Sequence, residues 1–324
     1  MKSIDTIMGV VVADALGVPV EFMSRQTLSL DPVTDMREYG THDQPRGTWS
    51  DDSSLTLATL DSLTHGLDYD DMMNCFVRWY RDHDYSPHQE VFDIGIATSE
   101  AFYRYLNHTP ALYSGSTNER SNGNGSLMRI APVALYLLAN DHDLKDDDIE
   151  GYEIIHKISG LTHRHPRSQV ACGIYCRILQ DLIRRHDELK HKEAIVTQAI
   201  DDALYIYSTY DFSEGIKQEV DTYAKLVDQC TFTSQDLSAI HSSGYVVHSL
   251  EAAIYCFMMT DNYKDCVLMA VNLGDDTDTV AAIAGGLAGT YYGLEAIPEE
   301  WRNVIARHEW INDLCTAFDQ SVSQ

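Results

Sequence analysis

Apolar residues recur at helical spacing along nearly the whole chain. Between residues 246 and 258 they fall at i, i+4, i+7, i+8 and i+11, and residues 171–182 and 195–204 show the same period. Such spacing places one apolar stripe on each helix, where it packs against a core. Sustained alternation of apolar and polar residues, the pattern of a half-buried strand, is missing from the sequence. The pattern therefore predicts an all-α fold.

Polar segments containing Pro, Gly and Asn mark the loops between these helices. Two long ones cover residues 29–49 and 113–125. Neither has the composition of a flexible linker between domains, and no internal repeat of roughly 20–50 residues is visible. We therefore expect one compact domain over residues 1–324.

The charge balance excludes several partners. The chain has 324 residues, with 50 Asp and Glu against 23 Lys and Arg, and a formal net charge of −27. Because this charge repels phosphate backbones and anionic lipid, we expect neither direct nucleic-acid binding nor membrane association. No uninterrupted apolar run approaches about 18 residues, and the first residues make a poor signal peptide. An anionic ligand would need local donors or metal ions.

The seven cysteines favour a reducing compartment. Their number is odd, and no Cys-x-x-Cys motif occurs. Cys172 and Cys176 lie four residues apart in an apolar helical pattern, so we predict that both are core thiols. We expect a cytoplasmic protein and, in the absence of any sequence feature that bears on oligomeric state, a monomer.

Two acidic segments open helices far apart in the sequence. The first contains Ser50, Asp51 and Asp52, and the second contains Asp276 and Asp278. An ordinary helix N-cap is one interpretation, but a cap explains one side chain and not two adjacent carboxylates. Carboxylate and hydroxyl oxygens are ligands for Mg²⁺, Mn²⁺ or Ca²⁺ rather than Zn²⁺. If the segments meet in the fold, they could form a two-metal site.

Three other segments allow both structural and functional interpretations. Asp14 interrupts an apolar helix, either as a packing detail or as a buried functional carboxylate. The turn Gly123–Gly125 precedes a helix, where backbone N–H groups can reach an anion, but a plain turn has the same sequence. His163 and His165 fit a polar loop. Walker A, His-Glu-x-x-His and Gly-x-Ser-x-Gly motifs are not found.

Taken together and in this order, these segments resemble the ADP-ribosylglycohydrolase family over about residues 4–295. This all-α, Mg²⁺-dependent family includes dinitrogenase-reductase-activating glycohydrolase and the ADP-ribosylarginine and ADP-ribosylserine hydrolases. The matching pieces are Gly9, Asp14–Gly17, Glu21, Trp49–Asp52, Phe92–Gly95, Gly123–Arg129, Thr162–His163, Gly244–Val246 and Asn272–Thr279. The resemblance implies a compact orthogonal helical bundle.

The resemblance also implies a set of site residues. Two Mg²⁺ ions, with Mn²⁺ as a substitute, would be bound by Ser50, Asp51, Asp52, Asp276, Asp278 and Thr279. The family often has Thr at the position of Ser50, and Gly-Gly-Asp where this chain has Gly274-Asp275-Asp276. Asp276 is therefore expected to be the metal ligand, and Asp275 is expected to contact the ligand side chains without binding the metal. The expected substrate contacts are Asp93, Gly123, Asn124, Gly125, Ser126, Met128, His163 and Tyr245.

The implied activity is metal-dependent removal of ADP-ribose from a modified side chain. The arginine N-glycosidic linkage is favoured over the serine O-linkage. Breaking the bond at the ribose builds oxocarbenium-like charge, and a carboxylate takes a proton from the attacking water. Glu21, Asp51 and Asp276 are equal candidates for that base. Two alternatives stay open, namely hydrolysis of a small ester such as O-acetyl-ADP-ribose, and a non-catalytic ADP-ribose-binding or structural protein.

Overall fold

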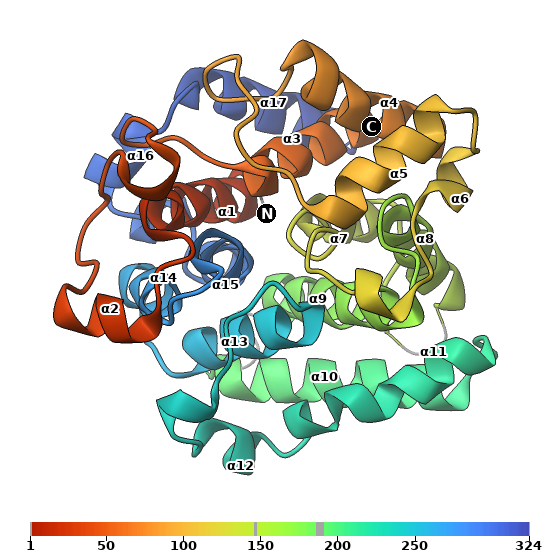
Figure 1. The fold of residues 1–324 in the computed structure, drawn as a ribbon. Helices are drawn as coiled ribbons and strands as arrows, with labels where there is room; N and C mark the ends of the chain where they lie inside the picture. The colour runs from red at the N-terminus through yellow and green to blue at the C-terminus, as the bar shows by residue number, and fades with distance from the viewer. Residues whose placement is uncertain (1, 146–147, 186–190, 324) are drawn as a thin grey trace.

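The predicted all-α fold is confirmed by the computed structural model, which describes residues 2–145, 148–185 and 191–323 (Figure 1). Within these ranges the chain forms helices joined by loops, and it contains no β-strand. Three isolated bridges pair Tyr39 with Gln44, Ser116 with His163, and Gly123 with Tyr245. The last two bridges involve residues that the sequence marked as functional.

The described helices follow one another along the chain. The α-helices are α1 (Ser3–Gly17), α2 (Arg25–Leu30), α3 (Asp51–Thr64), α4 (Tyr69–Asp82), α5 (Ile96–Leu106), α6 (Ala111–Ser114), α7 (Ala131–Ala139), α8 (Ile149–Gly160), α9 (Pro166–Arg185), α10 (Lys192–Thr209), α11 (Glu214–Glu219), α12 (Gln229–Thr233), α13 (Val246–Met258), α14 (Tyr263–Asn272), α15 (Thr277–Tyr292), α16 (Glu299–Val304) and α17 (His308–Ser321). The 3₁₀ turns are η1 (Val18–Val20), η2 (Gly40–His42), η3 (Glu119–Ser121), η4 (Val220–Leu226), η5 (Leu237–Ala239) and η6 (Leu294–Ala296).

The periodic segments form helices as predicted, and α9 and α10 extend beyond their apolar patterns at both ends. α13 has the limits of its apolar pattern, whereas α9 begins at Pro166, five residues before its apolar pattern of residues 171–182. Proline has its φ angle preset for a helix and lacks an N–H that would be unsatisfied in the first turn. The helix therefore starts at the proline, directly after the polar His163–His165 segment.

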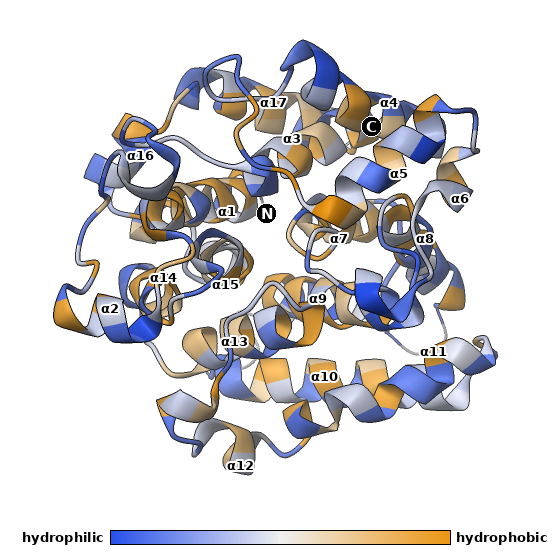
Figure 2. Cartoon of the chain, viewed as in Figure 1, coloured by the Kyte–Doolittle hydropathy of each residue, from blue (hydrophilic) through white to orange (hydrophobic). Residues whose placement is uncertain are grey.

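α1 runs through the centre of the molecule. By length and composition, residues 3–20 could cross a membrane, but 89% of that segment is buried inside the fold. The residues of α1 from Thr6 to Gly17 are all buried, and the hydropathy colouring marks much of this helix as apolar (Figure 2). Such a helix is apolar on nearly all sides because protein surrounds it.

Glycines allow α1 and α15 to pack backbone against backbone. These two helices make the most extensive helix pair in the described structure, and they lie side by side (Figure 1). A Cβ on Gly285 would stand 2.3 Å from the carbonyl oxygen of Gly9, and a Cβ on Gly17 would stand 2.4 Å from the Cα of Asp278. The end of α1 therefore touches the start of α15, where the second acidic segment lies.

The predicted core thiols are confirmed. Cys172 and Cys176 on α9 are fully buried, and neither forms a disulfide. Burial raises the pKa of both thiols, which keeps them protonated and unreactive.

Candidate active site

The two acidic helix starts, 227 positions apart in sequence, meet in the fold. Ser50 caps α3 by accepting a hydrogen bond from the backbone N–H of Asp52, and its hydroxyl donates to Asp52 Oδ2 at 2.9 Å. Thr279, in the first turn of α15, donates to the same carboxylate oxygen at 3.2 Å. The N-cap interpretation is therefore correct for Ser50, and the segment also joins a larger cluster of oxygen atoms.

Asp14 on α1 anchors the start of α3. Its carboxylate accepts hydrogen bonds from the backbone N–H groups of Ser50 and Ser53, both at 3.0 Å, and from the Ser53 hydroxyl at 2.5 Å. Burial raises the pKa of Asp14 to about 6, against the opposing effect of these hydrogen bonds. Asp14, the polar residue that interrupts the first apolar helix, thus holds the start of the first acidic segment in place. Its position alone in an apolar run did not distinguish this role from a packing detail.

Five helix-borne or loop carboxylates come close enough together to share cations. The carboxylate oxygens of Asp14, Asp52 and Asp278 lie within 4.8 Å of one another, and so do those of Glu21, Asp93 and Asp278. Burial is the larger cause, and repulsion from neighbouring carboxylates the smaller one, that raises the pKa of Asp52 and Asp278 well above the usual range. The same two effects act on Asp51.

Two oxygen atoms of this cluster test whether a metal would fit. Asp52 Oδ1 and Asp278 Oδ2 are buried and have no hydrogen-bond partner in the described structure. A buried carboxylate oxygen without a partner is costly, and a cation would relieve both that cost and the mutual repulsion. All the donors are carboxylate or hydroxyl oxygens, which fits a hard divalent cation such as Mg²⁺.

Glu21 reaches the cluster from a turn after η1. Phe22 and Asp275 both have left-handed backbones, with φ angles of 65° and 61°. The Phe22 N–H donates to the carbonyl of Asp275 at 2.7 Å, and the Asp275 N–H donates to the carbonyl of Met23 at 2.8 Å. This backbone tie fixes Glu21 beside Asp276. Asp275 itself is exposed and contributes through its backbone. The expectation that its carboxylate contacts the metal-ligand side chains is therefore not met.

The pKa of Glu21 is shifted toward neutrality. Burial raises it to about 7, and the negative charges of Asp93 and Asp276 act in the same direction. A hydrogen bond with Nε2 of His42 acts against this rise. A carboxyl group with such a pKa can exchange a proton near pH 7.

A cavity of about 460 Å³ opens over the cluster and is large enough for a small-molecule ligand. It brings together most of the residues expected at the site. Those lining it are Glu21, Asp51, Asp93, Gly123, Asn124, Gly125, Met128, His163, Asp276 and Thr279. Ser50, Asp52 and Asp278 are buried beneath this lining.

The glycine turn packs closely on His163. A Cβ on Gly125 would lie 2.8 Å from Cε1 of the His163 ring, so a larger residue does not fit there. Burial lowers the pKa of His163 to about 3, so the ring is neutral at pH 7. Asn124 links the turn to the acidic segment, because its Nδ2 donates to Asp276 Oδ2 at 2.8 Å.

Two expected substrate contacts do not line the cavity. Ser126 is fully buried, and its hydroxyl accepts a hydrogen bond from Ser159 at 2.9 Å on the far side of the turn. Tyr245 supports the turn through its backbone bridge to Gly123, while its ring lies beside Arg167 and His248. Its neighbour Gly244 lines the cavity instead.

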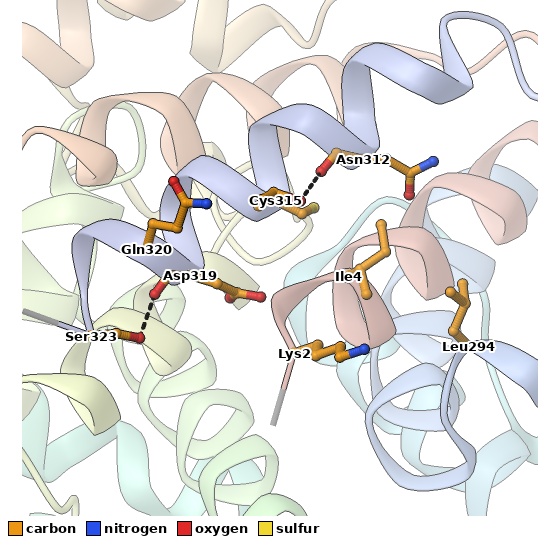
Figure 3. A pocket seen from close by; sticks show the side chains of 9 residues that line it. Lys2, Ile4, Leu294, Asn312, Cys315, Asp319, Gln320 and Ser323 are labelled. Atoms are coloured by element: carbon orange, nitrogen blue, oxygen red, sulfur yellow. Dashed lines mark hydrogen bonds between the residues drawn. The ribbon is translucent and has the colours of Figure 1, made fainter.

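A second cavity lies between the start of α1 and the last helix, α17, and it has fewer ionisable groups than the first (Figure 3). Among the described residues that line it, Asp319 has the single carboxylate, and this carboxylate accepts hydrogen bonds from the backbone N–H of Ser3 at 3.1 and 3.3 Å. That carboxylate therefore stabilises the start of α1. The clustered carboxylates and the glycine turn point to the other cavity as the active site.

Comparisons with known proteins agree with this geometry. The family model described as ADP-ribosylglycohydrolase matches residues 2–324. An ADP-ribosylarginine hydrolase Tri1 from Serratia proteamaculans is 31% identical, over 97% of this chain and 77% of its own length. The ADP-ribosyl-[dinitrogen reductase] glycohydrolase of Rhodospirillum rubrum is 28% identical, over 93% of this chain and 88% of its own length. Human ADP-ribosylhydrolase ARH3 is 25% identical, over 88% of this chain and 80% of its own length.

A solved structure shows the same fold. An ADP-ribosylglycohydrolase-related protein complex superposes with a TM-score of 0.74 at 28% identity, covering 98% of this chain and 97% of that one. The chain belongs to the ADP-ribosylglycohydrolase family and is a glycohydrolase enzyme.

Proposed function

We propose that this ADP-ribosylglycohydrolase removes ADP-ribose from modified arginine side chains and that it uses two Mg²⁺ ions. The observation that carries the proposal is the meeting of Asp52 and Thr279, which joins two acidic helix starts under one cavity. The arginine linkage is favoured because the Serratia relative, at 31% identity, is named an ADP-ribosylarginine hydrolase. The relative named ARH3 is less similar, at 25%.

The metal ions would be held by six side chains from two helix starts. These are Ser50, Asp51 and Asp52 at α3, and Asp276, Asp278 and Thr279 at α15. Bound Mg²⁺ would orient the ribose hydroxyls and lower the pKa of a water molecule at the reacting carbon. Mn²⁺ has the same preference for oxygen ligands and would substitute.

Glu21 is the best-placed base for the reaction. Its carboxylate lies in the cavity beside Asp93 and Asp278, within reach of a water molecule bound there. Water attacks the anomeric carbon as the bond to the arginine nitrogen breaks. Glu21 accepts the proton from that water and returns a proton to the departing guanidine, so free arginine and ADP-ribose result.

The glycine turn would bind the diphosphate of the substrate. A net charge of −27 opposes a diphosphate, so local donors have to attract it. Gly123 and Gly125 line the cavity, and a ligand can approach their backbone closely because neither residue carries a side chain of its own. His163, which is neutral, would contribute packing and a hydrogen bond rather than charge.

The test is release of ADP-ribose from matched substrates. Arginine-ADP-ribosylated peptide, serine-ADP-ribosylated peptide and O-acetyl-ADP-ribose are each incubated with the enzyme, first with Mg²⁺ and then with EDTA. The proposal predicts Mg²⁺-dependent release from the arginine peptide at a rate at least tenfold above the other two. Faster turnover of the serine peptide or of the free ester would reassign the linkage, and equal rates in EDTA would refute the metal requirement.

A further inference from the structure

His42 lies directly against the carboxylate of Glu21. Its Nε2 forms a hydrogen bond with Glu21 Oε2, and both side chains are largely buried, at 11% and 6% exposure. No local pattern predicts this contact, because His42 falls in a polar loop. Exposure this low means that water does not compete freely for either partner.

Two aromatic rings hold the imidazole of His42 in place. The Phe22 ring lies at 5.9 Å between centroids in an edge-on arrangement, and the Phe92 ring lies at 5.1 Å and is tilted. The three rings come from separate segments, namely the turn after η1, the turn η2 and the loop before α5. The ring is therefore restricted on two sides while Nε2 faces Glu21.

The backbone around His42 is fixed independently of its side chain. Gly40 has a φ angle of 63°, and a Cβ there would stand 1.9 Å from the carbonyl oxygen of Pro19, so η2 rests directly on η1. Thr41 donates from its hydroxyl to the carbonyl of Glu21 at 2.7 Å. Because η2 is attached to the segment that carries Glu21, the imidazole remains opposite the carboxylate.

Glu21 needs such a partner. Its carboxylate oxygen shares a cluster with those of Asp93 and Asp278, and no cation among the residues lining the cavity pairs with it in the described structure. Repulsion from these groups favours rotation of the Glu21 side chain out of the cavity. The hydrogen bond with His42 opposes that rotation.

We propose that His42 is a positioning residue that holds the Glu21 carboxylate in the cavity, facing Asp93 and Asp278. This inference rests on the proposed function for the role of Glu21 in turnover. His42 does not line the cavity and so acts through Glu21. Its loss should lower the rate of the chemical step and leave substrate affinity nearly unchanged.

Two substitutions separate the hydrogen bond from the packing. His42→Phe keeps an aromatic ring between Phe22 and Phe92 but removes the donor, whereas His42→Gln keeps an N–H near the position of Nε2. His65→Phe, at an exposed histidine that ends α3, serves as the control. For hydrolysis of ADP-ribosylated peptide, we expect His42→Phe to lower kcat at least tenfold with KM within twofold, and His42→Gln to recover most of kcat.

A second measurement does not depend on activity. Calorimetric titration with Mn²⁺ should show a several-fold weaker affinity for His42→Phe than for the wild type, and near-normal affinity for His42→Gln, because the Glu21 carboxylate adds its negative charge beside Asp278, one of the six proposed ligands. If the wild type binds Mn²⁺ but hydrolyses no substrate, the proposed function fails, and this titration still decides the role of His42.

Wild-type kcat and Mn²⁺ affinity in His42→Phe would overturn the inference. A His42→Gln variant as impaired as His42→Phe would also overturn it, since packing alone would then explain the loss.

Discussion

The Thr279 hydroxyl donates to Asp52 Oδ2 at 3.2 Å and so joins the first turns of α15 and α3. This contact depends on how α1 packs. α1 supplies Asp14, which binds the start of α3, and Gly17, which touches the backbone of Asp278. One helix, α1, thus positions both acidic segments. Substitutions on α1 and on the acidic segments should therefore affect stability and metal binding to different extents.

Replacement of Asp278 by Asn should abolish metal binding and leave the fold intact. Asp278 belongs to both carboxylate clusters, and its Oδ2 has no partner in the described structure. For the wild type, Mg²⁺ at a hundred times its Kd should add about 2.7 kcal/mol to the free energy of unfolding. We expect no Mg²⁺-dependent rise in Tm for Asp278→Asn, and a normal rise for Asp313→Asn at an exposed position on α17. A full rise in both variants would contradict the metal assignment.

The metal-free enzyme should lose stability as pH rises from about 4.5 to 7. The pKa of Glu21 is raised from 4.5 to about 7 in the folded state, so the folded chain retains a proton that the unfolded chain releases in this range. The pKa of His42, raised mainly by its hydrogen bond with Glu21, acts in the same direction at higher pH. Each such group should lower the free energy of unfolding by about 1.4 kcal/mol per pH unit within its window.

Urea unfolding in EDTA at several pH values checks this slope. Glu21→Gln removes the group, so its free energy of unfolding should fall less steeply with pH than that of the wild type. Parallel pH dependences for the two proteins would show that Glu21 ionises normally in the fold.

Gly125→Ala should weaken ligand binding by at least tenfold. The added methyl group would lie 2.8 Å from Cε1 of His163, so either the turn or the ring has to move. Gly95→Ala is a matched control on the same cavity, because its nearest contact would be Thr98 Oγ1 at 3.8 Å. Calorimetry with free ADP-ribose measures both variants, and equal affinities would mean that the turn does not cradle the ligand.

Gly285→Ala should destabilise the whole fold. Its Cβ would meet the Gly9 carbonyl oxygen at 2.3 Å, and two helix backbones cannot separate locally without loss of packing along their length. We expect the free energy of unfolding to fall by about 2 kcal/mol or more. Urea unfolding checks this, with Gly95→Ala as the variant expected to change little.

The sequence was sufficient to predict the all-α fold and to single out the two acidic segments that meet in it. Helical period predicted α13, and Asp or Ser before an apolar run predicted a capped helix at residue 50. Pairings between distant segments were harder to predict. The contact of His42 with Glu21 depends on Gly40 resting on Pro19, a tertiary contact that no local pattern encodes.

The direction of a side chain in an irregular turn was also beyond the sequence. Ser126 follows Gly125 in a segment that has neither helical nor strand period, so nothing in the sequence showed that its hydroxyl faces Ser159. For Asp275, the left-handed backbone decides the outcome, because it turns the side chain to solvent and the peptide groups toward Phe22 and Met23.

Asp14→Asn should be more harmful than its small change in shape suggests. Both oxygens of the Asp14 carboxylate accept hydrogen bonds from the start of α3, and an amide would place an NH₂ donor against N–H and O–H donors. We expect a loss of about 3 kcal/mol or more in the free energy of unfolding, because charge-assisted bonds to buried groups are lost. Mg²⁺ affinity should fall as well, since Ser50 and Asp52 lose their anchor.

Asp5→Asn on the same helix is the matched comparison. Asp5 Oδ1 accepts a single described hydrogen bond, from the backbone N–H of Leu294 at 3.0 Å, far from the acidic cluster. Its replacement should cost about 1 kcal/mol and leave Mg²⁺ affinity unchanged. Urea unfolding and Mg²⁺ calorimetry on the two variants separate general damage to α1 from loss of the anchor. If Asp5→Asn weakens Mg²⁺ binding as much as Asp14→Asn does, α1 acts as a rigid whole rather than through the Asp14 carboxylate.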